Sequence, residues 1–237
     1  VKKLEVSGHQ LRATFEGKNA PAEPQVFDRV LVAVGRVPNG KAVGVEAAGV
    51  KVDDRGFIAV NRRQQTNVSH IYAIGDICGE PMLAHKASYE GRVAAEAIAG
   101  LKTEYDAMTV PSVAYTDPEV AWMGLTEREA RSLGIDYEKS VFPWSASGRA
   151  LAMGRQDGRT KLLWNKTTGR LLGAAVTGVH AGELLSEMTL ALEMGADLDD
   201  IALTIHPHPS LSETVMMAAE AGLGTITDLF IPKRKGG

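Results

Sequence analysis

The order of short apolar segments and turns after Thr109 limits the fold of this part of the chain more than any other feature. Its apolar segments predict strands at 113–115, 120–123, 138–142, 161–164 and 171–177. The turn at 165–169 separates the last two, which favours an antiparallel sheet. Apolar residues at helical spacing then predict helices at 183–194, 197–203 and 212–221. Strands followed by helices indicate an α+β domain with a mainly antiparallel sheet.

The residues before Thr109 have a different pattern, typical of α/β structure. They predict strands at 3–7 and 10–15, a hairpin around 53–56, a short strand at 71–74 and a helix at 83–101 that ends near Gly100. Val30–Val34 is an almost unbroken apolar run, which predicts a strand covered on both faces, and the breaker cluster 35–39 ends it. We therefore expect a boundary near residue 35.

Composition and charge exclude several classes of function. The chain has 26 basic and 29 acidic residues and a net charge of −3, so nucleic-acid binding is not its expected main role. Its apolar runs fall short of the roughly 20 residues that a membrane span requires, and its start does not resemble a signal peptide. A cytoplasmic location is therefore expected. The single cysteine, Cys78, excludes an internal disulfide and a multi-cysteine zinc site.

Two histidines near the carboxyl end are the strongest candidates for chemistry. His206 and His208 each precede a proline, which keeps both residues out of helical geometry. Imidazole is the natural proton acceptor at neutral pH, so His208 is the expected base and Glu213 the carboxylate that orients it. The alternative is that Ser210 and Glu213 form a capping box and Glu213 only fixes a helix start. No metal is expected, because a zinc site would need further ligands.

A second group of candidates could contact a cofactor. Asp76 follows the end of an expected strand, where its carboxylate could accept hydrogen bonds from sugar or ribitol hydroxyls, or could simply cap a turn. The helix that begins near residue 83 could direct free backbone N–H groups at an anion or a reduced flavin, although an ordinary helix start has the same pattern. The candidates at this helix start are Leu83, Ala84 and His85. The candidates at the end of the expected strand 30–34 are Ala33, Val34, Gly35 and Arg36. Glycine-rich nucleotide motifs are absent from the sequence, and a simple turn remains the alternative for 33–36.

Several stretches occur in the order found in the C-terminal half of flavoprotein disulfide reductases, and the sequence resembles the lipoamide-oxidising members of that family. The stretches are VLVAVGRVPN at 30–39, IYAIGDICGEPMLAHKASYEG at 71–91, VPSVAYTDPEVAWMGLT at 110–126, FPWSASGRA at 142–150 and IHPHPSLSE at 205–213. The resemblance implies that 1–35 is the tail of an NAD-binding domain, 36–108 a central FAD-contacting region and 109–237 an interface domain that forms a homodimer. Glutathione reductases are the nearest alternative within the family. Mercuric reductases need cysteines near the carboxyl end, and this sequence has none after Cys78.

The same resemblance implies roles for individual residues. Asp76 would bind the FAD ribitol, the backbone of Leu83, Ala84 and His85 would meet the flavin, and Ala33 to Arg36 would lie against NAD. His208, oriented by Glu213, would take a proton from a dihydrolipoamide thiol in the active site of the opposite subunit. The thiol would be carried by a lipoylated acyltransferase or lipoyl-domain protein of a 2-oxoacid dehydrogenase complex.

The sequence also departs from the family pattern. It lacks the family's Gly-rich FAD motif and its Cys-x4-Cys pair, and Pro207 stands where a small residue is usual. The chain therefore resembles a fragment that is inactive alone, and a catalytically silent dimerisation module is the alternative from another class of function.

Overall fold

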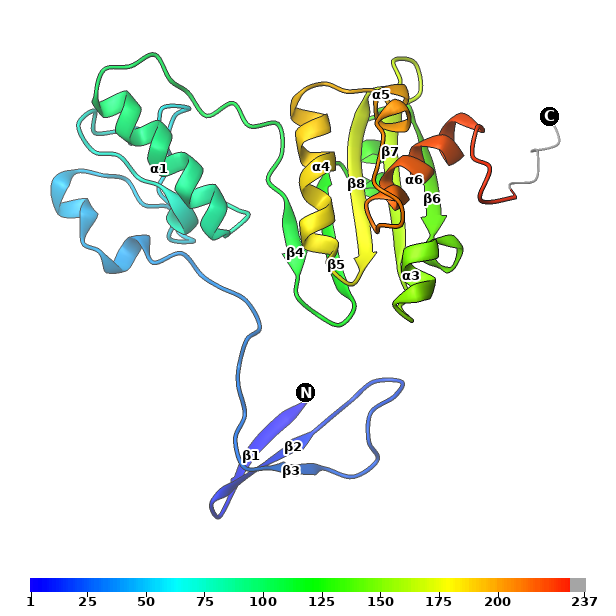
Figure 1. Cartoon of the computed structure of the whole chain (residues 1–237). Helices are drawn as coiled ribbons and strands as arrows, with labels where there is room; N and C mark the ends of the chain where they lie inside the picture. The colour runs from blue at the N-terminus through cyan, green and yellow to red at the C-terminus, as the bar shows by residue number, and fades with distance from the viewer. Residues whose placement is uncertain (231–237) are drawn as a thin grey trace.

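The computed structural model describes residues 1–230 and contains three parts along the chain (Figure 1). A small three-stranded sheet comes first, a central segment is built around one long helix, and a five-stranded sheet with helices follows. Residues 231–237 lie outside the described part. Within residues 1–230, no helix has both the length and the apolar character needed to cross a bilayer.

The first sheet is antiparallel, with its strands in sequence order. Its members are β1 (Lys3–Ser7), β2 (Gln10–Thr14) and β3 (Gln25–Phe27). The first two strands confirm the prediction, and the third was missed because its three residues are too few for a pattern. Only Ala13 is buried in this sheet, so it has almost no core.

The strand predicted at Val30–Val34 is wrong for this structure. The segment follows an extended course with no ladder partner among residues 1–230, and Leu31 and Val34 are 91% and 94% exposed. An apolar run of this kind forms a strand only when neighbouring strands and helices cover both of its faces. The described residues provide no such neighbours, so the sequence pattern is present without the structure that it predicts.

The central segment contains short helical turns and one long helix. The turns are the 3₁₀ helices η1 (Gly40–Ala42), η2 (Val45–Ala48) and η3 (Gly75–Ile77), and the helix is α1 (Ala84–Ile98). The turn expected at 53–56 forms, with Gly56 at φ +94°, but no strand ladder flanks it. The strand expected at 71–74 is reduced to a single bridge between Gln65 and Tyr72. A small core of Val50, Ile58 and Ala73 holds the segment together.

Helix α1 ends where the sequence predicted. Gly100 adopts φ +82°, a left-handed conformation in which glycine lacks the steric cost of a Cβ atom. The apolar residues of α1 at helical spacing form a stripe in which Val93, Ala94 and Ala97 are buried, while Ile98 is exposed. The remaining buried positions on this face belong to the charged residues Lys86 and Glu90.

The C-terminal part is a five-stranded antiparallel sheet with helices packed on it. The strand order is β4-β5-β8-β7-β6, for β4 (Ser112–Ala114), β5 (Glu119–Gly124), β6 (Tyr137–Pro143), β7 (Arg159–Asn165) and β8 (Leu171–Gly178). The longer helices are α4 (Ala181–Glu193) and α6 (Glu213–Leu223), and the shorter ones are α2 (Glu127–Ser132), α3 (Gly148–Ala152) and α5 (Leu198–Leu203). Helix α4 packs on β5 and β8, and α6 packs on β6 and β7 (Figure 1). This arrangement confirms the predicted α+β class.

The largest core of the described chain lies between this sheet and its helices. Phe142, Trp144, Leu162, Met188 and Val215 are almost completely buried there. Thr126 followed three residues later by Glu129 is the sequence pattern of a capping box, and this capping box is present at the start of α2, with each side chain bonded to the other residue's backbone. Helix α3 and the 3₁₀ turn before it, η4 (Trp144–Ala146), were not predicted, because a segment this short has no readable periodicity.

Glu127 at the start of α2 joins two strands electrostatically. Its carboxylate pairs with Lys139 of β6 at 2.6 Å and with Lys161 of β7. The hydrogen bonds from these two ammonium groups lower the pKa of Glu127 to about 2. Because the folded pKa lies below the unfolded one, this stabilisation is complete above about pH 4.5 and is lost as the pH falls toward 2.

We predict that Glu127→Gln lowers the free energy of unfolding by about 1 kcal/mol at pH 7, a value that allows for solvent screening of the pair. Urea unfolding at pH 7 and pH 3 should show the difference from wild type shrinking at the lower pH. Glu138→Gln is the control, because Glu138 forms only a 3.8 Å pair with Lys166 at the surface of the same sheet. A Glu127→Gln effect that is constant with pH would contradict the electrostatic explanation.

Candidate active site and cofactor surface

His208 lies in the loop between α5 and α6 and is paired with a carboxylate. Its Nδ1 is 2.8 Å from Oε1 of Glu213, the first residue of α6. A carboxylate oxygen accepts, so the proton of this hydrogen bond is on Nδ1 and the Nε2 lone pair is left available. The side chain of His208 is 77% exposed and that of Glu213 is 10% exposed. The ring therefore has the tautomer and the access that a general base needs.

Glu213 also fixes the start of its helix. Its second carboxylate oxygen accepts a 2.7 Å hydrogen bond from the backbone N–H of Ser210, and its own N–H donates to Ser210 Oγ. The sequence left open whether Glu213 orients a base or caps a helix. In this geometry one oxygen serves each purpose, so the two interpretations are compatible.

Buried hydrogen bonds attach α6 to the sheet beneath it. The Thr214 hydroxyl donates to the Leu211 carbonyl and lies 2.8 Å from the Thr160 hydroxyl of β7, which accepts from Trp144 Nε1. Ser140 of β6 donates to the Ala218 carbonyl at 2.5 Å. Because a buried polar group without a partner is costly, these contacts hold α6 in one position and Glu213 with it.

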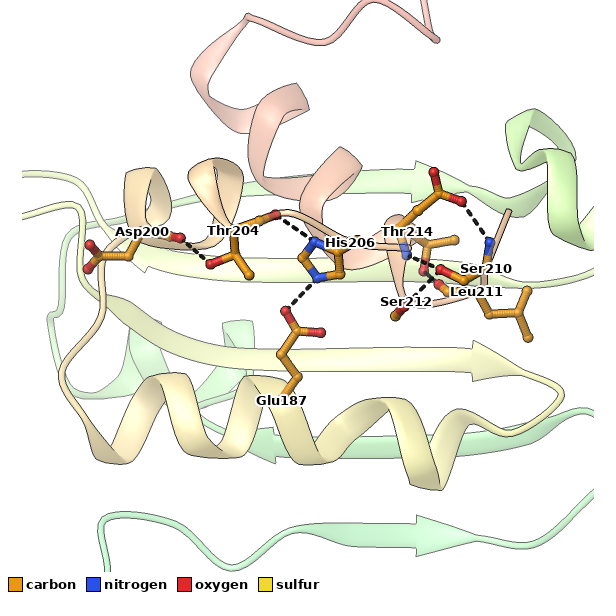
Figure 2. Close-up of polar contacts among 9 residues, drawn as sticks. Glu187, Asp200, Thr204, His206, Ser210, Leu211, Ser212 and Thr214 are labelled. Atoms are coloured by element: carbon orange, nitrogen blue, oxygen red, sulfur yellow. Dashed lines mark hydrogen bonds and ion pairs between the residues drawn. The ribbon is translucent and has the colours of Figure 1, made fainter. Parts of the chain in front are cut away.

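His206 occupies a different environment from His208, although only one residue separates them. Its ring nitrogens contact the Thr204 carbonyl and the Glu187 carboxylate, each at 2.7 Å (Figure 2). Its side chain is only 5% exposed. Among residues 1–230, no group of three or more His, Cys, Asp or Glu side chains is arranged to hold a metal ion.

Asp76 and Arg36, two of the candidate cofactor residues, are in contact. Arg36 Nη1 lies 3.3 Å from Asp76 Oδ2 and 3.5 Å from the Met82 carbonyl oxygen. Asp76 belongs to η3 and keeps 39% of its side chain exposed. The sequence assigned these residues to different ligands, and the structure brings both to one surface next to the start of α1. Ala33, Val34 and Gly35 remain on the exposed segment that leads to it.

The first turn of α1 has the features of an anion-binding surface. Leu83 precedes the helix in extended conformation, and within the described chain no side chain caps its first N–H groups. The first turn begins with Ala84 and His85 and contains no acidic residue, so the positive end of the helix dipole is not neutralised. His85 Nε2 lies 2.8 Å from the Pro111 carbonyl. Open amides beside the half-exposed Asp76 carboxylate form a donor and acceptor set that fits a polar ring with a hydroxylated chain.

A buried ion pair, which sequence reasoning missed, fixes this surface from beneath. Lys86 Nζ lies 2.8 Å from Glu90 Oε1, with both side chains less than one-tenth exposed. Glu90 Oε2 accepts from Gly75 N–H at 2.6 Å, and Lys86 donates to the Gly79 carbonyl at 3.3 Å. The pair therefore holds both ends of the loop that carries Asp76. The sequence did contain a signal for this pair, because Lys86 and Glu90 occupy the same helical spacing as the buried apolar residues of α1.

Comparisons with known proteins assign the class of protein. A model described as the pyridine nucleotide-disulphide oxidoreductase dimerisation domain matches residues 110–219, and the model of the pyridine nucleotide-disulphide oxidoreductases matches residues 1–91. The chain belongs to the pyridine nucleotide-disulphide oxidoreductase family. Among solved structures it is similar to LpdA from Mycobacterium tuberculosis, with a TM-score of 0.81 and 24% identity over 92% of this chain and 47% of that one.

Similar curated proteins indicate which members of the family the chain resembles. The chain is 55% identical to a dihydrolipoyl dehydrogenase of Vibrio cholerae and 54% identical to one of Haemophilus influenzae, in each case over 99% of its length. It covers 50% and 49% of those proteins, so it spans about half the length of the curated relatives that it matches. The HOCl-induced flavoprotein disulfide reductase RclA of Escherichia coli has the same fold, with a TM-score of 0.80 and 25% identity over 92% of this chain and 49% of that one.

We predict that Glu90→Leu destabilises the chain by about 3–5 kcal/mol, because it leaves the Lys86 ammonium buried without a partner. The double variant Lys86→Met/Glu90→Gln should recover most of this loss, since no charge remains and the amide oxygen can still accept from Gly75. Urea unfolding measures both. Arg92→Ala is the control, since Arg92 forms an exposed pair with Glu96 at the same spacing in α1. Equal losses in Glu90→Leu and Arg92→Ala would contradict the assignment.

Proposed function

We propose that the chain forms the C-terminal half of a dihydrolipoyl dehydrogenase, which oxidises protein-bound dihydrolipoamide and reduces NAD. The observation that carries this proposal is the exposed His208 ring held by the Glu213 carboxylate at 2.8 Å. The dihydrolipoyl dehydrogenases similar to this chain over nearly its whole length support the same reaction.

His208 performs the proton transfer in the proposed reaction. Its free Nε2 accepts a proton from a dihydrolipoamide thiol, so the thiolate becomes available as the nucleophile. The ring is then an imidazolium, and Glu213 Oε1 stabilises the new positive charge while keeping the ring orientation fixed. The imidazolium then releases the proton to water, to which the 77% exposed side chain has access, and the neutral base is restored.

The proposal assigns the cofactors to the surface at the start of α1. Asp76 accepts hydrogen bonds from the FAD ribitol, and the backbone of Leu83, Ala84 and His85 faces the flavin ring. The segment of Ala33, Val34, Gly35 and Arg36 lies against NAD. When bound, FAD and NAD supply the electron transfer from dithiol to nicotinamide. The open amides and the half-exposed carboxylate support this assignment.

The chain cannot supply the redox disulfide of the reaction. Its only cysteine, Cys78, is half-buried, and burial raises the pKa of the thiol to about 12, with the nearby Glu90 carboxylate adding to the shift. The reactive thiolate is therefore scarce at neutral pH. We infer that the redox pair belongs to another part of the complete enzyme.

The proposal includes a homodimer in which His208 serves the opposite subunit. The match of residues 110–219 to a dimerisation domain supports it, as do the exposed Leu190 and Met194 at the end of α4 and Leu203 and Ile205 near the histidine loop. The proposed partner is a lipoylated acyltransferase or lipoyl-domain protein of a 2-oxoacid dehydrogenase complex. The proposed location is the cytoplasm.

We predict that His208→Gln in the complete enzyme lowers kcat for dihydrolipoamide by about 10²- to 10⁴-fold and leaves the flavin bound. Glu213→Gln should give an intermediate loss, because an amide stabilises the imidazolium less than a carboxylate does. Ser210→Ala is the control, since it removes the contact with the Glu213 N–H and leaves the carboxylate on His208. Steady-state kinetics and flavin absorbance measure these effects, and unchanged turnover in His208→Gln would refute its role as the base.

We also predict that the 237-residue chain has no dihydrolipoamide turnover by itself. Gel filtration and a flavin absorbance spectrum separate two states of this chain. A colourless dimer without turnover supports a silent dimerisation module as the role of the isolated chain, and bound flavin contradicts it. Turnover by the chain alone would overturn the inference that its redox pair lies elsewhere.

A further inference from the structure

His206 lies in the same loop as His208 and is not used by the proposed mechanism, yet it has more polar partners than His208. It precedes His208 in the loop from α5 to α6, and its ring reaches between Thr204 of that loop and Glu187 of α4 (Figure 2). Thr204 is itself fixed, because its hydroxyl donates to the Asp200 carbonyl of α5 at 2.8 Å. The ring therefore connects the loop to two helices.

The contacts of His206 engage both of its ring nitrogens. The Thr204 carbonyl oxygen can only accept, so Nδ1 donates to it at 2.7 Å. The other nitrogen, Nε2, lies 2.7 Å from a Glu187 carboxylate oxygen. Neither ring nitrogen of His206 is therefore left without a partner.

His208 has a different set of contacts. Within residues 1–230, Glu213 is its one hydrogen-bond partner, and that contact uses Nδ1 alone. The loop holds one ring with both nitrogens engaged and, two residues later, one ring with a free nitrogen. Their burial follows the same division, since the His206 side chain is 5% exposed and that of His208 is 77% exposed.

We propose that His206 and Glu187 are positioning residues that hold the loop so that His208 is presented at a fixed place. This inference rests on the proposed function of His208. The loop has two attachments, His206 to α4 on one side of His208 and Ser210 to Glu213 on the other. Prolines 207 and 209 limit backbone rotation between the attachments. Fixing both ends of so short and stiff a segment restricts where the His208 ring can move.

The kinetic test uses the complete enzyme and four variants. His206→Ala and Glu187→Ala should each lower kcat per bound flavin by about 10- to 100-fold, the scale expected when a reacting group is misplaced by about 1 Å. The KM for dihydrolipoamide should change little. Glu187→Gln should restore most of the activity, because its side-chain amide can still form a hydrogen bond with His206 Nε2. Glu183→Gln is the matched control, because it alters an exposed carboxylate one turn earlier in α4.

The outcomes of this test are distinct. Normal kcat in His206→Ala and Glu187→Ala would overturn the proposal. Equal losses in Glu187→Gln and Glu187→Ala would also overturn it, since the hydrogen bond would then not be the feature that matters. Loss of flavin with normal kcat for the flavin that remains would indicate a structural role only and would refute positioning.

A second measurement does not depend on turnover. In the complete enzyme labelled with ¹⁵N-histidine, the Nε2 signal of His206 should move in Glu187→Ala, because that variant removes its hydrogen-bond partner, and the His206→Ala spectrum identifies the His206 signals. An Nε2 signal that does not move in Glu187→Ala would contradict the proposed anchor. If the wild-type enzyme does not oxidise dihydrolipoamide, the proposed function fails, and the ring measurement then decides separately whether the anchor exists.

Discussion

The carboxylate of Glu213 is the contact on which the organisation of the site depends. One oxygen receives the His208 ring and the other receives the backbone of Ser210, so the orientation of the base and the start of α6 are determined together. The next residue, Thr214, is completely buried and bonded to β7 through Thr160. A side chain that acts at the surface is thereby connected within two residues to the hydrophobic core. The position of the His208–Glu213 pair therefore depends on the packing of α6 against the sheet.

The second candidate surface follows the same principle with different chemistry. Asp76 is left half-exposed, while the loop that carries it is fixed by Glu90 from below and by Lys86 at its far end. In both places a buried carboxylate supports the backbone and a more exposed side chain beside it remains accessible to a ligand. A buried charge is tolerated because it has a partner at hydrogen-bond distance and a backbone group to bind. The proposed His206–Glu187 anchor is a third instance of this arrangement.

The sequence predicted the C-terminal sheet and helices well because the signals are local. Alternating strands, the turn at 165–169 and the capping box at Thr126 depend on near neighbours that the chain itself provides. The strand prediction for Val30–Val34 was wrong for the opposite reason. An apolar run becomes a buried strand only when other elements cover it, and residues 1–230 do not provide such elements. His208 and Glu213 were readable from five-residue spacing. The Lys86–Glu90 pair and the Glu187 contact to His206 were not readable, because charged residues on a helix are usually assigned to solvent and the spacing of 187 and 206 has no pattern.

The exposure of His208 has a bearing on selectivity. An imidazole with most of its surface in water has no walls of its own and can take a proton from any acid that reaches it. If His208 is the base that we propose, discrimination between one thiol and another has to come from the surface that faces the ring in the assembled enzyme. Reactivity and choice of substrate would then reside in different parts of the assembly, and either one could change without rebuilding the other.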